Sequence, residues 1–255
     1  MRKILFCILF ILSVYANAQE TITISGQVTD FEGSPIDSSI VRLLYPNFTD
    51  AYVTYTDKNG YYKLDNVEKG KYMAMYALRP KEYPRANAVA EKDMRLEFWA
   101  WNVIADKDLT INPRYHKLEL YGTTVFKTFG GYNGLFVYFR PMSLTKYISY
   151  SKDVYLDKKK AEKVADISIK PEHLKVKVYA DGELLKINSV QPVDEFEGEG
   201  NSSITGYIVQ ADMPKSKPDK PYITIRVVAE NTEFNETGEN IYFYELPQLV
   251  KAPLK

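Results

Sequence analysis

Short stretches in which apolar and polar residues alternate recur along this 255-residue chain. They occupy residues 22–28, 41–45, 72–78, 174–179, 223–227 and 241–243. Because successive side chains of a β-strand point to opposite faces, this period of two predicts strands with one buried face. Turn signals such as Asn59-Gly60 and Asp181-Gly182 lie between them and are typical of hairpins, since Asn and Gly tolerate a positive φ. The pattern predicts a mainly β protein built of two sandwich modules.

Composition narrows the classes of function. The chain is 45% hydrophobic and 26% charged, which is typical of a globular protein and excludes wholesale disorder. Its 33 basic residues balance 33 acidic ones, so no excess charge is available to attract nucleic acid. Two histidines and one cysteine are too few for a metal centre or a Cys/His nucleophile. We therefore predict no metal, no cofactor and no nucleic-acid partner.

The N-terminus predicts export. Two basic residues precede an apolar run at residues 4–14, and Ala16 and Ala18 form a small-x-small cleavage site, which together predict a signal peptide over residues 1–18. The run is shorter than the roughly 20 residues that a membrane-spanning helix needs, so we expect no transmembrane segment in the mature chain. Cys7 lies inside this leader, which leaves the mature chain without disulfides. The leader resembles those of Gram-negative bacteria, so we expect the protein in the periplasm or at the cell surface.

The middle of the chain holds the most apolar strands, at residues 96–103, 118–121 and 135–139. We divide the mature chain into a first β domain at residues 19–122 and an Ig-like β domain at residues 123–255. The Gly130-Gly131 pair near this boundary also fits a turn inside one sandwich.

Helical spacing is confined to one region. Leu144, Tyr147 and Ile148 stand at i, i+3 and i+4, which predicts a short helix after Pro141. A second, lysine-rich stretch follows at residues 157–164 and is interpreted as another short helix.

A series of motifs in residues 24–78 points to a family. The motifs are ISGQVTD from residue 24, GSPI from 33, VRL from 41, TDKNGYY from 56 and GKY from 70. The series resembles the carboxypeptidase regulatory-like domain, a seven-stranded transthyretin-type sandwich grouped with carbohydrate-binding-like folds, over residues 20–105. The resemblance implies a module that is not itself catalytic and that accompanies peptidases, outer-membrane receptors or surface proteins. It makes carbohydrate the first ligand class to test.

The strand around Trp99 is the candidate ligand site. If the even-numbered positions of residues 96–100 point into the core, Glu97, Trp99 and Trp101 share the opposite face. Two indoles on a wet face would form a platform for a sugar ring, with polar contacts from Glu97 and Asn102. The alternatives are that both tryptophans are buried where the two modules meet, or that they belong to an ordinary core.

Other polar groups are given structural interpretations. The acids of one loop could bind calcium but lack the glycine framework of a calcium loop, so we interpret them as solvated: Asp194, Glu195, Glu197 and Glu199. Residues 57–60 have the opening of a calcium loop but lack the carboxylate that should close it, so we interpret them as a turn. His116 and His173 are expected at the surface. The 21 tyrosines fit strands better than a recognition surface.

No nucleophile, phosphate-loop or zinc motif is present in the sequence. The prediction is therefore an exported, non-catalytic binding protein of the cell envelope with a glycan as its ligand. The alternative is a structural or assembly protein that contacts another envelope protein through an exposed sheet edge. A hydrolase ranks third.

Overall fold

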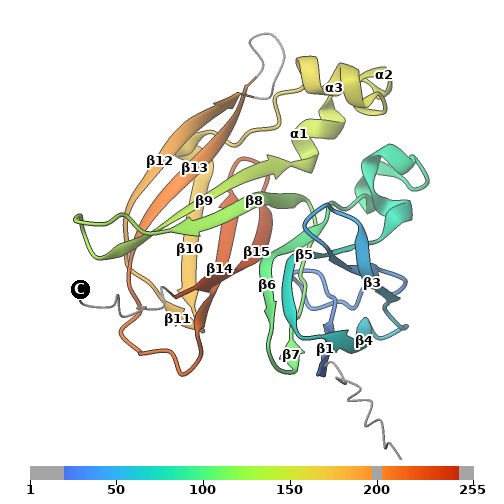
Figure 1. The fold of residues 1–255 in the computed structure, drawn as a ribbon. Helices are drawn as coiled ribbons and strands as arrows, with labels where there is room; N and C mark the ends of the chain where they lie inside the picture. Colours follow the sequence, from blue (N-terminus) through green and yellow to red (C-terminus); the bar gives the residue numbers. More distant parts are fainter. Residues whose placement is uncertain (1–19, 197–202, 247–255) are drawn as a thin grey trace, which may run out of the picture.

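The computed structural model describes residues 20–196 and 203–246 (Figure 1). The predicted signal peptide and the acids Glu197 and Glu199 lie outside these ranges. The first half contains β1 (Thr21–Gln27), β2 (Ile40–Leu44), β3 (Asp50–Tyr55), β4 (Tyr61–Glu68), β5 (Gly70–Leu78), the short 3-10 helices η1 (Pro80–Glu82), η2 (Pro84–Ala86) and η3 (Glu91–Asp93), β6 (Phe98–Ala105), β7 (Leu109–Thr110) and β8 (Leu118–Phe126). The second half contains β9 (Gly134–Ser143), α1 (Leu144–Ser149), α2 (Lys152–Tyr155), α3 (Lys158–Val164), η4 (Pro171–His173), β10 (Leu174–Ala180), β11 (Glu183–Leu184), β12 (Ile187–Phe196), β13 (Ser203–Asp212), β14 (Tyr222–Asn231) and β15 (Glu236–Glu245). The predicted mainly β class is confirmed.

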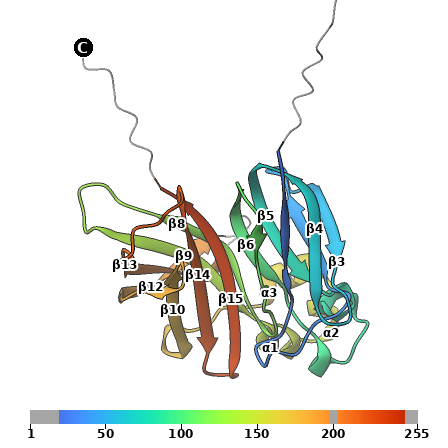
Figure 2. The ribbon, with the colours of Figure 1, turned by 90° about the horizontal axis from the view of Figure 1, so that it is seen from below.

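Three sheets build the fold. A central sheet has the order β11-β10-β14-β15-β6-β5-β2-β3, and the two smaller sheets have the orders β4-β1-β7 and β12-β13-β9-β8. The halves of the central sheet are joined by parallel pairing of β15 with β6, where Ile241 lies opposite Ala100. The two smaller sheets lie at opposite sides of the molecule (Figure 2).

The smaller sheets cover opposite faces of the central sheet. Along β15, Ile241 and Phe243 pack into the core that contains β1 and β4, whereas Tyr242 and Tyr244 pack into the core that contains β9 and β13. Because neighbouring residues of a strand point to opposite faces, the two smaller sheets pack on opposite faces of the central sheet, one on each side of the β15–β6 junction. Each half of the central sheet therefore has one face that no second sheet covers fully.

The predicted domain boundary at residue 122 falls inside β8. The Gly130-Gly131 pair lies in the connection between β8 and β9, which are antiparallel neighbours of one sheet. The glycine pair thus forms a turn within a sandwich. The division into residues 19–122 and 123–255 stays a prediction.

The turn at residues 57–60 differs from the prediction in its role. The Asp57 carboxylate accepts from the backbone N–H groups of Asn59 and Tyr61, and Gly60 has a φ of +77°. However, β3 pairs with β2 and β4 pairs with β1, so the turn crosses between sheets and is not a hairpin. Both strands have an apolar face, and placing them in facing sheets buries both in one core. The Asp181-Gly182 hairpin, in contrast, is confirmed by the pairing of β10 with β11.

The predicted helix after Pro141 is confirmed as α1, and the lysine-rich stretch contains α3. The Ser143 hydroxyl accepts from the N–H of Lys146 and so caps α1. Leu144 packs with Met94 and Leu96. Leu96 precedes β6 and is buried as supposed, in a small core against the helical segment and apart from the two sandwich cores. In the described residues no helix has the length and apolarity to cross a membrane.

Candidate functional site

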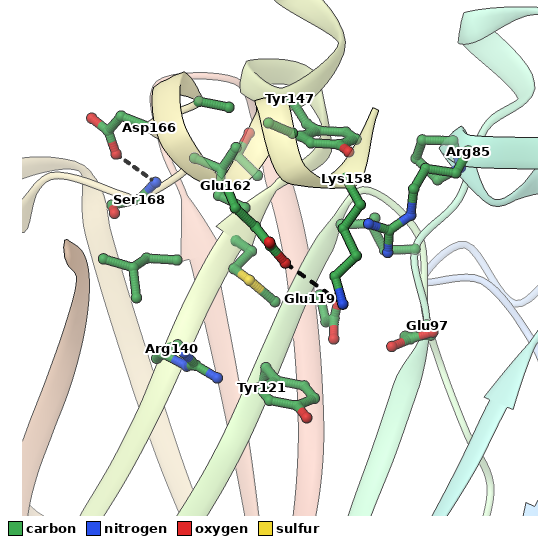
Figure 3. A pocket seen from close by; sticks show the side chains of 18 of the residues that line it. Arg85, Glu97, Glu119, Tyr121, Arg140, Tyr147, Lys158, Glu162, Asp166 and Ser168 are labelled. Carbon is green, nitrogen blue, oxygen red and sulfur yellow. Dashed lines mark hydrogen bonds and ion pairs between the residues drawn. The ribbon is translucent and has the colours of Figure 1, made fainter. Parts of the chain in front are cut away.

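A pocket of about 570 Å³ lies between the two sandwiches, on the face of β6 that the four-stranded sheet covers only at its edge. Its walls come from several separate parts of the chain (Figure 3). They include Tyr83, Arg85, Glu97 and Trp99 from the segment before and in β6, Glu119 and Tyr121 from β8, Arg140 from β9, and Tyr147, Lys158, Glu162, Asp166 and Ser168 from the helical segment and the chain after it.

One indole N–H joins two carboxyl groups in this pocket. The Nε1 of Trp99 donates to Glu97 Oε1 at 3.0 Å and to Glu119 Oε1 at 3.1 Å. Glu97 precedes β6 of the central sheet and Glu119 lies in β8 of the four-stranded sheet, so the contact connects the two sandwiches. Glu119 is only 3% exposed.

Burial makes these carboxyls weak acids. Burial raises the pKa of Glu119 well above its usual range, and the charge of Glu97 raises it further. Burial also raises the pKa of Glu97, against the opposing effect of the hydrogen bond from Trp99. Two carboxyls at close quarters cannot both ionise without mutual repulsion. Glu119 therefore keeps its proton at higher pH than an ordinary glutamate and can act as a hydrogen-bond donor.

The two tryptophans form a buried aromatic cluster. Their ring centroids are 4.8 Å apart with the planes within 12° of parallel, and Tyr121 packs edge-on against both. Trp99 is 7% exposed and Trp101 is 8% exposed. The predicted open platform is therefore not formed. Since Tyr121 belongs to β8 of the four-stranded sheet, the contact places the tryptophans where the two sandwiches meet.

Asn102 has a structural role in these contacts. Its backbone is left-handed, with a φ of +51°, and its Nδ2 donates to the carbonyl oxygen of Phe243 at 2.7 Å. This bond joins β6 to β15. Of the four predicted ligand residues, the structure brings Glu97 and Trp99 into the pocket lining and leaves Trp101 and Asn102 outside it.

The charged side chains that line the pocket contact neighbouring side chains. Lys158 pairs with Glu162 at 3.6 Å, as Figure 3 shows. Arg85 donates to the hydroxyl of Tyr83 at 3.2 Å. The guanidinium of Arg140 lies 4.9 Å from the ring centroid of Tyr121.

Sequence reasoning missed Glu119, Tyr121 and Arg140. All three lie on β8 and β9, in plain strand patterns, and no local signal marks them as neighbours of Trp99. His116, expected at the surface, is half-buried, and burial lowers its pKa. Across residues 20–196 and 203–246 no group of three His, Cys, Asp or Glu side chains could hold a metal ion.

The pocket offers a ligand both polar and apolar contacts. Carboxyl, phenol and indole groups supply donors and acceptors in a half-enclosed space, while aromatic rings supply apolar contact area. This combination suits a ligand that carries several hydroxyl groups on a compact carbon frame.

No protein-family model and no curated protein sequence matches the chain. Solved structures with some likeness include two pilins and a putative adhesin from Bacteroides ovatus. The major pilin subunit BcpA of Bacillus cereus is 12% identical, with 89% of this chain and 69% of that chain covered and a TM-score of 0.28. The major pilin SpaD of Corynebacterium diphtheriae is 8% identical, with 88% and 64% covered and a TM-score of 0.24. These TM-scores are too low to establish a common fold.

Proposed function

We propose that this chain is an exported, non-catalytic protein of the cell envelope that binds a glycan in the pocket between its two sandwiches. The observation that carries the proposal is the Trp99 N–H, which is shared by the buried carboxyl of Glu119 and the half-buried carboxyl of Glu97. The rings of Tyr83 and Tyr147 line the same pocket. The half-buried carboxyl of Glu97 contacts sugar hydroxyls, while tyrosine rings pack against the sugar's C–H face.

The resemblance of residues 20–105 to the carboxypeptidase regulatory-like domain supports the same ligand class. The strand orders β4-β1-β7 and β3-β2-β5-β6 are consistent with a seven-stranded sandwich in this part of the chain. We propose this family membership on the motifs of residues 24–78.

The geometry of the acids favours binding over hydrolysis. Glycosidases place two carboxyls on either side of the bond to be cut, separated by about 5–9.5 Å. Here Glu97 and Glu119 contact the same N–H, so both lie on one wall of the pocket. One wall can orient a sugar but does not flank a glycosidic bond.

Calorimetric titration of hits from a glycan array tests the proposal. The pocket variant is Tyr147→Ala, which removes a ring from the lining. The matched control is Lys159→Ala, an exposed residue of α3 outside the lining. We expect Tyr147→Ala to weaken binding by about tenfold, equivalent to about 1.4 kcal/mol, and the control to bind as the parent does. Absence of any glycan hit would contradict the proposal.

A second candidate function is assembly through a sheet edge. β3 is an edge strand of the central sheet, and its residues Val53 and Tyr55 are 44% and 61% exposed. An open edge with apolar side chains can pair with a strand of another envelope protein. Pull-down from an envelope extract tests this, since Tyr55→Lys on the edge should abolish capture while Tyr147→Ala leaves it unchanged.

A further inference from the structure

A second cavity lies on the opposite face of the central sheet. It is a groove of about 680 Å³ beside the three-stranded sheet. β1, the segment at residues 110–114, β14 and β15 line it. Trp99 pairs with Asn240 in the β15–β6 register, and Glu239, the residue before Asn240, points to the other face. The groove and the pocket are therefore separated by the sheet itself.

The floor of the groove is built by a close approach of two chain segments. A Cβ at Gly26 would lie 1.8 Å from the carbonyl oxygen of Ile111, so only glycine allows the segment at residues 110–114 to lie against β1. The Asn112 side chain accepts from the N–H of Gln27, and Thr29 donates to the carbonyl of Pro113. This segment places Arg114 at the groove.

Two guanidinium groups meet one carboxylate there. Arg114 donates to both oxygens of Glu239, through Nε at 3.0 Å and through a terminal nitrogen at 2.5 Å. Arg226 donates to the same carboxylate at 3.4 Å. The Glu239 side chain is 2% exposed, whereas those of Arg114 and Arg226 are 34% and 36% exposed. Two cations share one buried anion, so the trio carries one net positive charge on the groove side.

The arginines keep donors for a ligand. Aromatic rings hold both guanidinium planes, with Phe31 at 5.1 Å from Arg114 and Tyr179 at 4.4 Å from Arg226. The three hydrogen bonds that Arg114 and Arg226 donate to Glu239 use only some of the N–H groups of the two guanidinium groups. A planar guanidinium group matches the geometry of a carboxylate. The groove is therefore preorganised for an acidic group.

The remaining walls favour a sugar over a peptide. They carry the hydroxyl and amide side chains of Ser25, Gln27, Thr110 and Asn112. Tyr61, which is 55% exposed, adds an aromatic face. Hydroxyl and amide groups recognise sugar hydroxyls, and an exposed phenol ring stacks on a pyranose. The apolar lining residues Tyr62 and Ile111 are buried and present little surface to the side chains of a peptide.

We propose that the groove binds a uronate residue of an acidic polysaccharide, with its carboxylate on Arg226 and Arg114 and its ring on Tyr61. The inference does not depend on the pocket, because the two sites use different residues on opposite faces. A glycan with neutral and acidic residues could engage both.

Calorimetry with tri-galacturonate at about pH 7, where the uronate is ionised, tests the proposal. Maltotriose is the neutral probe. Arg226→Gln removes a cation, and Thr110→Glu adds a negative charge to the exposed wall without touching the Arg-Glu trio. Lys175→Gln is the control, because Lys175 is an exposed cation of β10 outside the groove. We expect each groove variant to weaken tri-galacturonate binding by about tenfold or more. The Lys175→Gln variant should bind tri-galacturonate as the parent does. The groove variants should leave any binding of maltotriose unchanged.

Added salt should weaken tri-galacturonate binding in the parent protein. The proposal is overturned if tri-galacturonate fails to bind at low salt, or if Thr110→Glu and Arg226→Gln bind it as the parent does. Equal or tighter binding of a glutamate trimer with the same response to the variants would assign the groove to acidic peptides and contradict the sugar assignment. Loss of binding on Tyr147→Ala would assign the signal to the pocket instead.

Discussion

Two glutamates are equally buried on opposite faces of the central sheet, but they have opposite electrostatic surroundings. Glu119 in the pocket and Glu239 in the groove are each 3% exposed. Glu119 faces another carboxyl and an indole N–H, so its proton is retained. Glu239 faces two guanidinium groups and forms ion pairs with both. Burial alone does not decide whether a carboxyl is an acid or an anion; its neighbours do.

The largest expected loss of stability concerns the pocket. Trp99→Ala removes a buried aromatic side chain and the N–H that serves both carboxyls. We expect the free energy of unfolding to fall by about 4 kcal/mol, measured by urea denaturation. A loss below about 1 kcal/mol would mean that the tryptophan is not part of a packed junction.

The next effect breaks the groove side. Arg114→Met leaves Glu239 with Arg226 as its remaining partner. Removing one partner of a buried ion pair is strongly destabilising, so we expect a loss of about 3 kcal/mol in urea denaturation. Lys63→Met is the control, since Lys63 and Asp65 form an exposed ion pair whose removal should leave stability close to that of the parent. Equal losses for the two variants would contradict a buried Arg-Glu trio.

Replacement of each glutamate by glutamine tests the comparison through the pH dependence of stability. A raised pKa in the folded state means that the stabilising contribution of Glu119 is fully present below its ordinary pKa and is lost as the pH rises through the raised value. We therefore expect Glu119→Gln to increase stability at about pH 8, on the order of 1 kcal/mol, and to flatten the fall in stability between mildly acidic and alkaline pH.

Glu239→Gln should change stability in the opposite direction. It removes the anion that both arginines contact, so we expect stability to fall at about pH 8 by on the order of 1 to 3 kcal/mol. Thermal unfolding of both variants across pH measures the contrast. Stabilisation by Glu239→Gln, or destabilisation by Glu119→Gln at alkaline pH, would remove the distinction between the two sites.

The last prediction concerns the hydrogen bond between β6 and β15, which joins the halves of the central sheet. Asn102→Ala loses the hydrogen bond to Phe243 and places an alanine at positive φ, whereas Asn102→Gly loses only the bond. We expect the alanine variant to lose about 2 kcal/mol of unfolding free energy and the glycine variant about 1 kcal/mol. If both variants unfold like the parent, the contact contributes nothing to the junction.

Strand periodicity was sufficient for the fold class and local spacing for α1. The pairing of β6 with β15 joins segments about 140 residues apart and leaves no local mark in either strand, so the sequence does not predict the shared sheet. For the same reason the turn at residues 57–60 looked like a hairpin: turn chemistry specifies the bend and not the sheet that the next strand joins.

The candidate site was predictable only in part. Alternation correctly placed Glu97 and Trp99 on one face. It could not reveal that Tyr121 would pack against the indoles or that Glu119 would share their N–H, because both come from β8 of the other sandwich. A pair of buried acids is recognisable only once the strands are in place.

Intrinsic fluorescence tests the proposed pocket most directly, because the chain has two tryptophans and both lie in the cluster at this site. Titration with the array-selected glycan should give a saturable change in emission that persists in Arg226→Gln, across the sheet, and weakens about tenfold in Tyr147→Ala. Emission that stays constant while calorimetry records binding, or a change that Tyr147→Ala leaves intact, would mean that the sugar does not occupy the space beside Trp99.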